Sequence, residues 1–378
     1  MMRVLMVSKA NVTASYRTKL GYLNRTPGLT VGLVVPPRWG KLSFEPMSDD
    51  ATYPLYVRPI WFNGHNHLHR YPGIARLIGK FRPDLIHIDE EHYSAVTWEI
   101  IRIARRIGLP TVFFTWQNIY KRYPWPFSAM ERMVLTSARA AIAGNQEALE
   151  VLRKKGFTAT ARVIPQFGTD DQIFVPAEAS ATRVRLGLQD SVAIGYVGRL
   201  IAEKGLDDLM TAAVPLLEKN PSARLVLVGS GPWRAKGEQM ARQAGIASRV
   251  VFVSWLASGE MPQLMNALDI VVLPSRTTAS WKEQFGRVLT EAMATKTPVV
   301  GSSSGEIPGV IGDAGWVFPE GDVKELGRIL ERLVNNPVER QRWGECGYQR
   351  VRRYYTQAAV AEATVSLYRE ILGEPPPK

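Results

Sequence analysis

Short apolar runs alternate with helical patterns along the whole chain, and they form two series. The first series has strand-like runs at 3–8, 31–36, 85–89, 111–116 and 140–144. The second has them at 191–198, 224–231, 249–255, 269–274 and 297–302. Apolar runs of this length are typical of buried strands, and helical patterns such as 95–108 separate several of them. The alternation predicts an α/β fold with one doubly wound parallel sheet for each series.

The two series are separated by residues 163–180, a segment rich in turn-forming residues that is typical of a connection between domains. We therefore predict a first domain over 1–170 and a second domain over 171–353. The last segment, 354–378, contains a helical pattern at 357–372 that we expect to return to the first domain. Its proline-rich tail, GEPPPK, is expected to be disordered.

The net charge of +12 is confined to the first half of the chain. Residues 1–167 carry 23 Lys and Arg but 11 Asp and Glu, whereas residues 168–378 carry 24 of each. This asymmetry indicates an anionic partner for the first half, and an anionic membrane surface or an acidic acceptor is compatible with it. Nucleic acid is disfavoured as a partner because no nucleic-acid-binding motif is present. The alternative is a solvated basic surface without a partner.

Cysteine content and hydropathy indicate the compartment. The single cysteine, Cys346, allows no internal disulfide, and the apolar run at the N-terminus is too short for a signal peptide. No segment offers the roughly 18 apolar residues of a membrane span. We expect a soluble cytoplasmic protein, and the basic first half leaves peripheral association with the inner membrane open.

Two carboxylates, Glu283 and Glu291, stand with seven residues between them in the segment 274–309. A strand-like run precedes this segment and a helical pattern, LTEAMAT, lies within it, so the loop between them is expected at the carboxyl edge of a parallel sheet, where such folds bind ligands. Two helical residues eight positions apart differ by about 80° around the helix, so both carboxylates could address one ligand. Carboxylates beside a helix N-terminus suit a ligand with hydroxyls and phosphates, such as a nucleotide sugar.

Arg199 and Lys204 stand five residues apart at the end of another strand-like run. Arginine offers a planar fork to phosphate oxygens and lysine a mobile point charge. Because the sequence contains no Asp-x-Asp pair, these two cations lead to the hypothesis that a diphosphate leaving group is stabilised without a metal. We expect no cofactor other than the nucleotide-sugar co-substrate.

The order of these motifs resembles that of the retaining glycosyltransferases of the GT-B fold, in particular family 4. GYVGRLIAEKG (195–205) resembles the phosphate loop of that family, and LVLVGSGP (225–232) its next strand and turn. EQFGRVLTEAMATKTPVV resembles the Glu-x7-Glu donor motif, and SGEIPGVIGDAGWVFPEGD (304–322) the loop that follows it. The resemblance implies two Rossmann-like domains that face a cleft, with the acceptor bound by the first and the nucleotide sugar by the second.

The resemblance also implies roles for individual residues. Glu283, Arg199 and Lys204 would be catalytic, with Glu283 on the hydroxyls of the donor hexose and Glu291 on those of the ribose. The donor-binding residues that the resemblance implies are Gly198, Gly229, Leu256, Phe285, Gly286, Arg287, Val288, Leu289 and Glu291. The donor would be a UDP sugar rather than a GDP sugar, and the acceptor could be a glycan, a lipid-linked sugar or a small molecule.

The first domain resembles the family more loosely. Many members carry a histidine in a Thr-x-His-Asp context, where this chain has Thr115, Trp116, Gln117 and Asn118. An amide can hold a sugar hydroxyl but cannot act as a base or a cation. The glycine-rich acceptor loop is replaced by SKANVTAS (8–15). The acceptor-site candidates are Lys9, Asn11, His87, Glu90, His92, Gln117 and Asn118.

Other functions stay open at this point. A nucleotide-sugar epimerase or hydrolase could share the fold, and the missing histidine is compatible with a catalytically silent membrane-binding or carbohydrate-binding protein. A dinucleotide-dependent oxidoreductase is disfavoured, because the third glycine of a Gly-x-Gly-x-x-Gly motif is replaced by Arg234 at 229–234.

Two segments of the first domain have more than one interpretation. We interpret the segment with His65, His67 and His69 as a polar loop near the acceptor. The alternative is a strand, on which the three alternating residues would share a face and could hold a metal. Segment 118–133 interleaves Lys121 and Arg122 with four aromatic residues, which suits a membrane interface, a sugar-stacking pocket or core packing.

Overall fold

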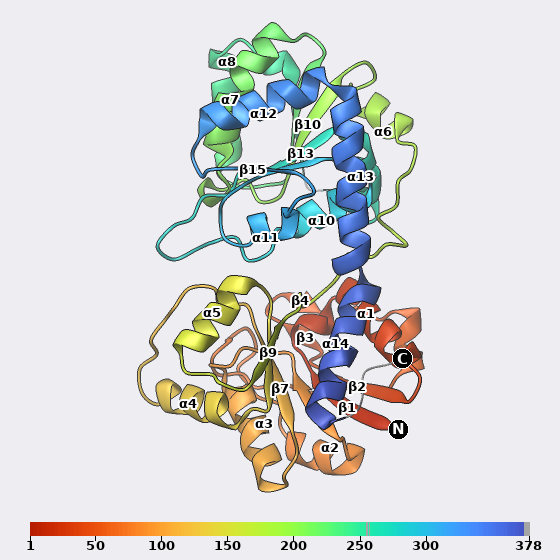
Figure 1. Ribbon diagram of the computed structural model, residues 1–378, viewed down its shortest axis with the longest axis vertical. Helices are drawn as coiled ribbons and strands as arrows, with labels where there is room; N and C mark the ends of the chain where they lie inside the picture. Colours follow the sequence, from red (N-terminus) through yellow and green to blue (C-terminus); the bar gives the residue numbers. More distant parts are fainter. Residues whose placement is uncertain (255, 257, 374–378) are drawn as a thin grey trace. The chain divides into compact units, whose positions relative to one another are not determined.

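The computed structural model describes residues 1–254, 256 and 258–373, so the tail 374–378, for which we predict disorder, lies outside the described residues. The chain divides into two compact units (Figure 1). Unit 1 comprises Met1–Gly168 and the segment from Gln357 onward, and unit 2 comprises Thr169–Thr356. Each unit has its own parallel sheet and its own apolar core.

Unit 1 contains a seven-stranded sheet in the order β5-β2-β1-β6-β7-β8-β9, in which every neighbouring pair is parallel. Its strands are β1 (Met2–Val7), β2 (Leu29–Val35), β5 (Leu55–Val57), β6 (Leu85–Ile88), β7 (Thr111–Thr115), β8 (Ala140–Ala143) and β9 (Thr160–Val163). The central strands are buried on both faces, which is why they appear in the sequence as continuous apolar runs. The edge strands β5 and β9 were not predicted, because they are short and partly exposed.

Helices cover both faces of this sheet. They are α1 (Ala14–Arg25), α2 (Ile74–Phe81), α3 (Ala95–Arg106), α4 (Phe127–Ser137), α5 (Gln146–Lys154) and α14 (Gln357–Leu372). Two short 3₁₀ helices, η1 (Ala10–Val12) and η2 (Ser48–Thr52), and a small hairpin of β3 (Arg38–Trp39) and β4 (Leu42–Ser43) complete the unit.

The C-terminal helix α14 is part of unit 1 although it follows unit 2 in the sequence. Its apolar residues Val360, Val365 and Tyr368 are fully or almost fully buried in the same core cluster as Leu20 and Leu23 of α1. A helix with three or more buried side chains on one face contributes several kcal/mol of apolar burial, so α14 is a structural element of this unit.

Unit 2 contains a six-stranded parallel sheet in the order β12-β11-β10-β13-β14-β15. Its strands are β10 (Val192–Val197), β11 (Ala223–Val228), β12 (Val250–Val253), β13 (Ile270–Leu273), β14 (Val299–Ser302) and β15 (Trp316–Phe318). Its helices are α6 (Ser180–Arg185), α7 (Leu206–Lys219), α8 (Trp233–Gln243), α9 (Met261–Ala267), α10 (Arg287–Ala294), α11 (Ile307–Ile311), α12 (Val323–Asn335) and α13 (Pro337–Tyr354). The 3₁₀ helices are η3 (Ala202–Lys204), η4 (Ala247–Arg249) and η5 (Ser258–Glu260).

Both sheets have one point at which the strand order reverses. In unit 1 the order reverses between β1 and β6, and in unit 2 between β10 and β13. At such a point the loops beyond the two carboxyl ends diverge and leave a crevice that binds ligands in open α/β sheets. The predicted fold class of two Rossmann-like α/β units is confirmed. Within the described part of the chain, no helix is both long and apolar enough to cross a lipid bilayer.

Candidate active site

The loop after β10 carries Lys204 to the end of β13. Lys204 is the last residue of η3, and Gly205 follows it with a φ of +66°. A Cβ atom at Gly205 would lie 1.8 Å from the carbonyl oxygen of Pro274, directly after β13. Only glycine fits at such a close backbone approach with a positive φ. This approach places Lys204 beside the loop that carries Glu283.

An ion pair between Lys204 and Glu283 lies at the strand-order reversal of unit 2. The Lys204 ammonium contacts Oε2 of Glu283, and the Ser275 hydroxyl donates a hydrogen bond of 2.9 Å to the same oxygen. The indole of Trp281 adds a cation–π contact, with its centroid 4.9 Å from Nζ of Lys204. Glu283 is largely buried, and the side chains of Lys204 and Glu283 keep 14% and 11% of their surface exposed, so the pair lies just below the surface of the loop.

The expected helical spacing of Glu283 and Glu291 is wrong. Helix α10 begins at Arg287 with Gly286 as its N-cap, so Glu283 lies in the preceding loop and only Glu291 is helical. Gly286 has a φ of +79°, a conformation that favours glycine and turns the chain from the loop into the helix. The two carboxylates therefore flank the start of α10 instead of sharing one face of it.

Glu291 is paired within its own helix. Its Oε1 lies 3.0 Å from Nε of Arg287, one turn earlier. Burial raises the pKa of Glu291, and the charge of Arg287 opposes this rise. The side chain of Glu291 is 12% exposed and that of Arg287 is 49% exposed, so a ligand that displaced Arg287 could reach the carboxylate.

The other predicted donor-binding residues lie beyond the carboxyl ends of the unit 2 strands, and they differ in how far their side chains are exposed to solvent. Arg199 is exposed after β10, and Gly198 and Gly229 follow β10 and β11. Leu256, Phe285 and Val288 pack partly buried against the core. Leu289 is fully buried and its N–H group already donates to the Gly286 carbonyl, which disfavours a ligand contact there.

Sequence reasoning missed the residues that hold the Glu283 loop. Arg276 makes a bidentate contact with Asp208 of α7, at 2.5 and 2.7 Å. Thr277 donates from its backbone and its hydroxyl to Glu320, at 2.7 and 2.6 Å. Ser275 could have been found, because it directly follows a strand at the predicted ligand edge; the partners of Arg276 and Thr277 are distant in sequence and leave no local signal.

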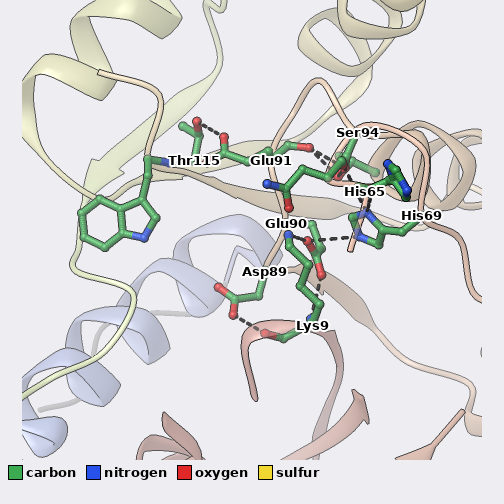
Figure 2. Close-up of polar contacts among 12 residues, drawn as sticks. Lys9, His65, His69, Asp89, Glu90, Glu91, Ser94 and Thr115 are labelled. Carbon is green, nitrogen blue, oxygen red and sulfur yellow. Dashed lines mark hydrogen bonds and ion pairs between the residues drawn. The ribbon is translucent and has the colours of Figure 1, made fainter. Parts of the chain in front are cut away.

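At the strand-order reversal of unit 1, the structure brings together two of the acceptor candidates, Lys9 and Glu90. Figure 2 shows Lys9 and His69 pointing toward the Glu90 carboxylate from two different loops. The backbone N–H of Lys9 donates to Oε1 of Glu90 at 2.7 Å, its ammonium contacts Oε2, and Nε2 of His69 lies 3.3 Å from Oε2. Burial acts to raise the pKa of Glu90, but the charges of Lys9 and His69 outweigh it and hold the pKa at about 2.

The two acidic residues on either side of Glu90, Asp89 and Glu91, also accept hydrogen bonds from neighbouring side chains. Asp89 accepts hydrogen bonds from Ser8 at 2.7 Å and from Gln166 at 3.1 Å, and Glu91 accepts from the Thr115 hydroxyl at 2.6 Å (Figure 2). Burial raises the pKa of Asp89, and the nearby Lys19 ammonium opposes this. These three carboxylates join the loops after β1, β6 and β7 into one polar layer.

Three further acceptor candidates, His87, His92 and Asn118, are buried. His87 is 1% exposed and its Nδ1 lies 2.6 Å from the Tyr368 hydroxyl of α14, and His92 has Nε2 3.1 Å from Glu131. Their burial disfavours direct contact with an acceptor. Asn118 donates to Glu147 at 3.3 Å.

Two buried amide side chains keep polar atoms free for a ligand. Gln117 donates to the Tyr123 hydroxyl at 2.7 Å but its Oε1 has no hydrogen-bond partner among the described residues. Within the same described set, neither polar side-chain atom of Asn11 has a partner. A buried amide without partners is costly, so a bound hydroxyl would stabilise these atoms. Asn11 is 0% exposed and Gln117 8%, so a ligand could reach them only if the loops around them moved.

His65, His67 and His69 lie in a loop, as the polar-loop interpretation predicts, and not on a strand. The segment is a loop in which the backbone N–H of His69 donates to the His65 carbonyl at 3.1 Å, so the three rings do not share a face. His69 is buried against Glu90, whereas His67 packs against Tyr93 at a centroid distance of 4.9 Å. In the part of the chain that the structure describes, no group of three or more His, Cys, Asp or Glu side chains could hold a metal.

Two sequence families match the chain. Glycosyl transferases group 1 matches residues 181–350, and the glycosyl transferase 4-like domain matches residues 22–166. A 2-deoxystreptamine glucosyltransferase of Streptomyces kanamyceticus is 30% identical over 288 residues, which cover 70% of this chain and 71% of that relative. An alpha-D-kanosaminyltransferase of the same organism is 28% identical over 247 residues, and the match covers 64% of this chain but only 63% of that relative.

Solved structures also resemble the chain. HepE of Anabaena, solved in complex with UDP, has a TM-score of 0.76 and 18% sequence identity, and the match covers 98% of this chain and all of that one. At this identity the likeness concerns the fold alone. It matches the two-unit architecture described above.

Proposed function

The chain belongs to the glycosyl transferases group 1 family and is a glycosyltransferase, and from this premise we propose that it moves a hexose from a nucleotide-diphosphate sugar to an acceptor hydroxyl. We propose further that the anomeric configuration is retained and that no metal is required. The observation that carries the proposal is the Lys204–Glu283 pair, supported by Ser275, at the strand-order reversal of unit 2.

The chemistry of the pair fits the two ends of such a donor. Glu283 supplies a carboxylate that can accept hydrogen bonds from sugar hydroxyls, and Lys204 and the exposed Arg199 supply positive charge for the diphosphate. Fixed charges aimed at a leaving group lower the barrier because they need no rearrangement during the reaction. Two cations at the predicted phosphate loop, together with a sequence that lacks Asp-x-Asp, support transfer without a metal.

We also propose which nucleotide base the donor sugar carries. We favour UDP because the structural neighbour from Anabaena was solved with UDP bound. The loops after β11 and β12, at Gly229 and Leu256, are the proposed contacts for the base, and Glu291 the proposed contact for the ribose. The acceptor is proposed to bind at unit 1, near Lys9, Asn11 and Gln117.

The test replaces Glu283 by Gln, which keeps the shape of the side chain and removes its charge. We expect kcat for glycoside formation to fall by about 10²–10³-fold, as when a preorganised group at a reacting centre is removed. The matched control is Glu325→Gln, because Glu325 pairs on the surface of α12 with Arg328 and should leave kcat unchanged. A Glu283→Gln rate within a few-fold of the wild-type rate would show that the site is misassigned, and loss of activity on EDTA treatment would refute metal independence.

Product analysis separates this function from its alternatives. A transferase consumes the donor only when an acceptor is present and forms a new glycoside, a hydrolase consumes it equally without acceptor, and an epimerase converts it to an isomeric nucleotide sugar. Thermal shifts with UDP, GDP and ADP rank the bases, because a ligand that binds the native state raises its stability in proportion to its affinity. A protein that is stabilised by none of the three would exclude UDP, GDP and ADP as the leaving group of its donor.

A further inference from the structure

Two loops at the carboxyl edge of the unit 1 sheet expose large apolar side chains. One loop follows the parallel strand β5 and the other follows β7, so both leave the sheet at the same edge. The exposed residues, which we call the aromatic surface, are Trp61 at 57%, Phe62 at 56%, Leu68 at 40%, Tyr120 at 44% and Trp125 at 82%. Single exposed apolar residues are ordinary, but five on two neighbouring loops mark an interaction site.

The two loops are joined beneath this surface by packed rings. The ring of His67 in the first loop contacts Tyr123 of the second loop and Phe127, the first residue of α4, edge-to-face, at centroid distances of 5.4 and 5.6 Å. The Lys155 ammonium donates to the Lys121 carbonyl at 2.6 Å and so fixes the second loop from below. These packed rings support the aromatic surface from within the unit. Among the described residues, Trp125 does not take part in this packing, and it exposes 82% of its surface to solvent.

The charges around the aromatic surface have one sign. Arg58, Lys121 and Arg122 are exposed on the same two loops. The sequence has no Asp or Glu between Asp50 and Asp84, and none between Glu99 and Glu131. Neither loop therefore carries an acidic side chain that could neutralise these cations.

We infer that the aromatic surface binds the surface of an anionic lipid bilayer, with the protein lying on the membrane. Tryptophan and tyrosine rings favour the boundary between headgroups and acyl chains, and basic residues beside them are attracted to anionic lipids. Each Lys or Arg near such a membrane contributes a factor of about five to binding. The inference does not depend on glycosyl transfer, so it can fail while the proposed function holds.

The experiment measures flotation of the full chain with phosphatidylcholine vesicles, with and without phosphatidylglycerol, at low and high NaCl. We expect binding only to vesicles that contain phosphatidylglycerol, and a strong decrease at high salt. The double variant Trp61→Ala, Trp125→Ala should lower the partition coefficient roughly tenfold or more because two interfacial rings are lost. Lys121→Glu with Arg122→Glu should lower it at least about 25-fold, from the loss of two positive charges alone.

The matched control changes the same charge at the opposite edge of the same sheet. Helix α3 leaves the carboxyl edge after β6 and ends near the amino end of β7, so its last residues, Arg105 and Arg106, are distant from the aromatic surface. Arg105→Glu with Arg106→Glu should retain most of the binding, and Ile107→Ala, at 62% exposure, tests an exposed apolar residue there. Unchanged thermal unfolding midpoints exclude misfolding as a cause.

Two results would overturn the inference. One is the absence of flotation of the wild-type protein with phosphatidylglycerol vesicles at low salt. The other is a loss in the α3 controls as large as in the surface variants, which would reduce the effect to net charge. A third result would assign the aromatic surface to another ligand. If the protein does not bind vesicles but the double variant Trp61→Ala, Trp125→Ala transfers sugar more slowly to a soluble sugar acceptor, the aromatic surface binds a glycan and not a membrane.

Discussion

The two sheets of this protein place a lysine–glutamate ion pair at the same topological position, and the two pairs differ in how completely they are enclosed. Lys9 and Glu90 follow β1 and β6, and Lys204 and Glu283 follow β10 and β13, the strands that flank the reversal in each sheet. Both pairs therefore lie where open α/β sheets bind ligands.

The unit 1 pair is closed. Both oxygens of Glu90 have donors, and the buried ring of His69 completes the set. The unit 2 pair is open. In the described part of the chain only Oε2 of Glu283 has partners, and its Oε1 makes no hydrogen bond or ion pair. The same two residue types at the same position can therefore have different roles. A glutamate whose two carboxylate oxygens both have protein donors stabilises the fold, whereas one with an oxygen that has no donor can bind a ligand.

The largest expected effect tests the closed pair. Glu90→Gln leaves the Lys9 ammonium and the fully buried His69 without their carboxylate, and breaking a buried ion pair costs about 3 kcal/mol of unfolding free energy or more. Urea unfolding followed by circular dichroism measures it. The control is Glu99→Gln, whose partner Arg70 is more exposed and which should cost about 1 kcal/mol at most. An equal loss of unfolding free energy in the two variants would mean that the buried Lys9–Glu90 pair stabilises the protein no more than the more exposed Arg70–Glu99 pair does.

A pH titration sharpens the same comparison. The pKa of Glu90 lies below its ordinary value of 4.5, at about 2, so its stabilising contribution is fully present above about pH 4.5 and is lost as the pH falls toward 2. The difference in unfolding free energy between wild type and Glu90→Gln should therefore shrink over this window, by about 3 kcal/mol. Denaturant unfolding of both proteins at several pH values measures it. A difference that stays constant with pH would show that the charge of Glu90 is not its cause.

The smallest expected effect concerns the open pair. Ser275→Ala removes one hydrogen bond to Glu283 but leaves Lys204 in place. A hydrogen bond to a charged group contributes about 1.5 kcal/mol, so kcat/KM for the donor should fall about tenfold, with little change in the thermal midpoint. Steady-state kinetics measures it against Ser222→Ala, an exposed serine before β11. If Ser275→Ala lowered stability and spared kcat/KM, the open pair would be structural as well.

How far the sequence predicts this molecule depends on the range of the interactions. The buried strands and α14 could be predicted because their apolar patterns are local, whereas the edge strands β5 and β9 lack a continuous apolar run. The proximity of Lys204 and Glu283 was implied by motif order, and its cause, the approach of Gly205 to Pro274, is visible only in three dimensions. His69 was predicted to lie in a loop or a metal site, and nothing near it in the sequence indicates that Glu90, 21 positions later, is its partner.

The position of α14 in the sequence has a consequence for synthesis of the protein. Unit 1 begins the chain, but Val360, Val365 and Tyr368, which complete its core, are made only after all of unit 2. On the ribosome, unit 2 can therefore complete its folding before unit 1 does. Until α14 is made, α1 and the strands of the unit 1 core are incompletely covered. A nascent chain of this kind exposes apolar surface for longest at its oldest part, the reverse of the usual N-terminal-first order, and its first half is the part that a chaperone would be expected to hold.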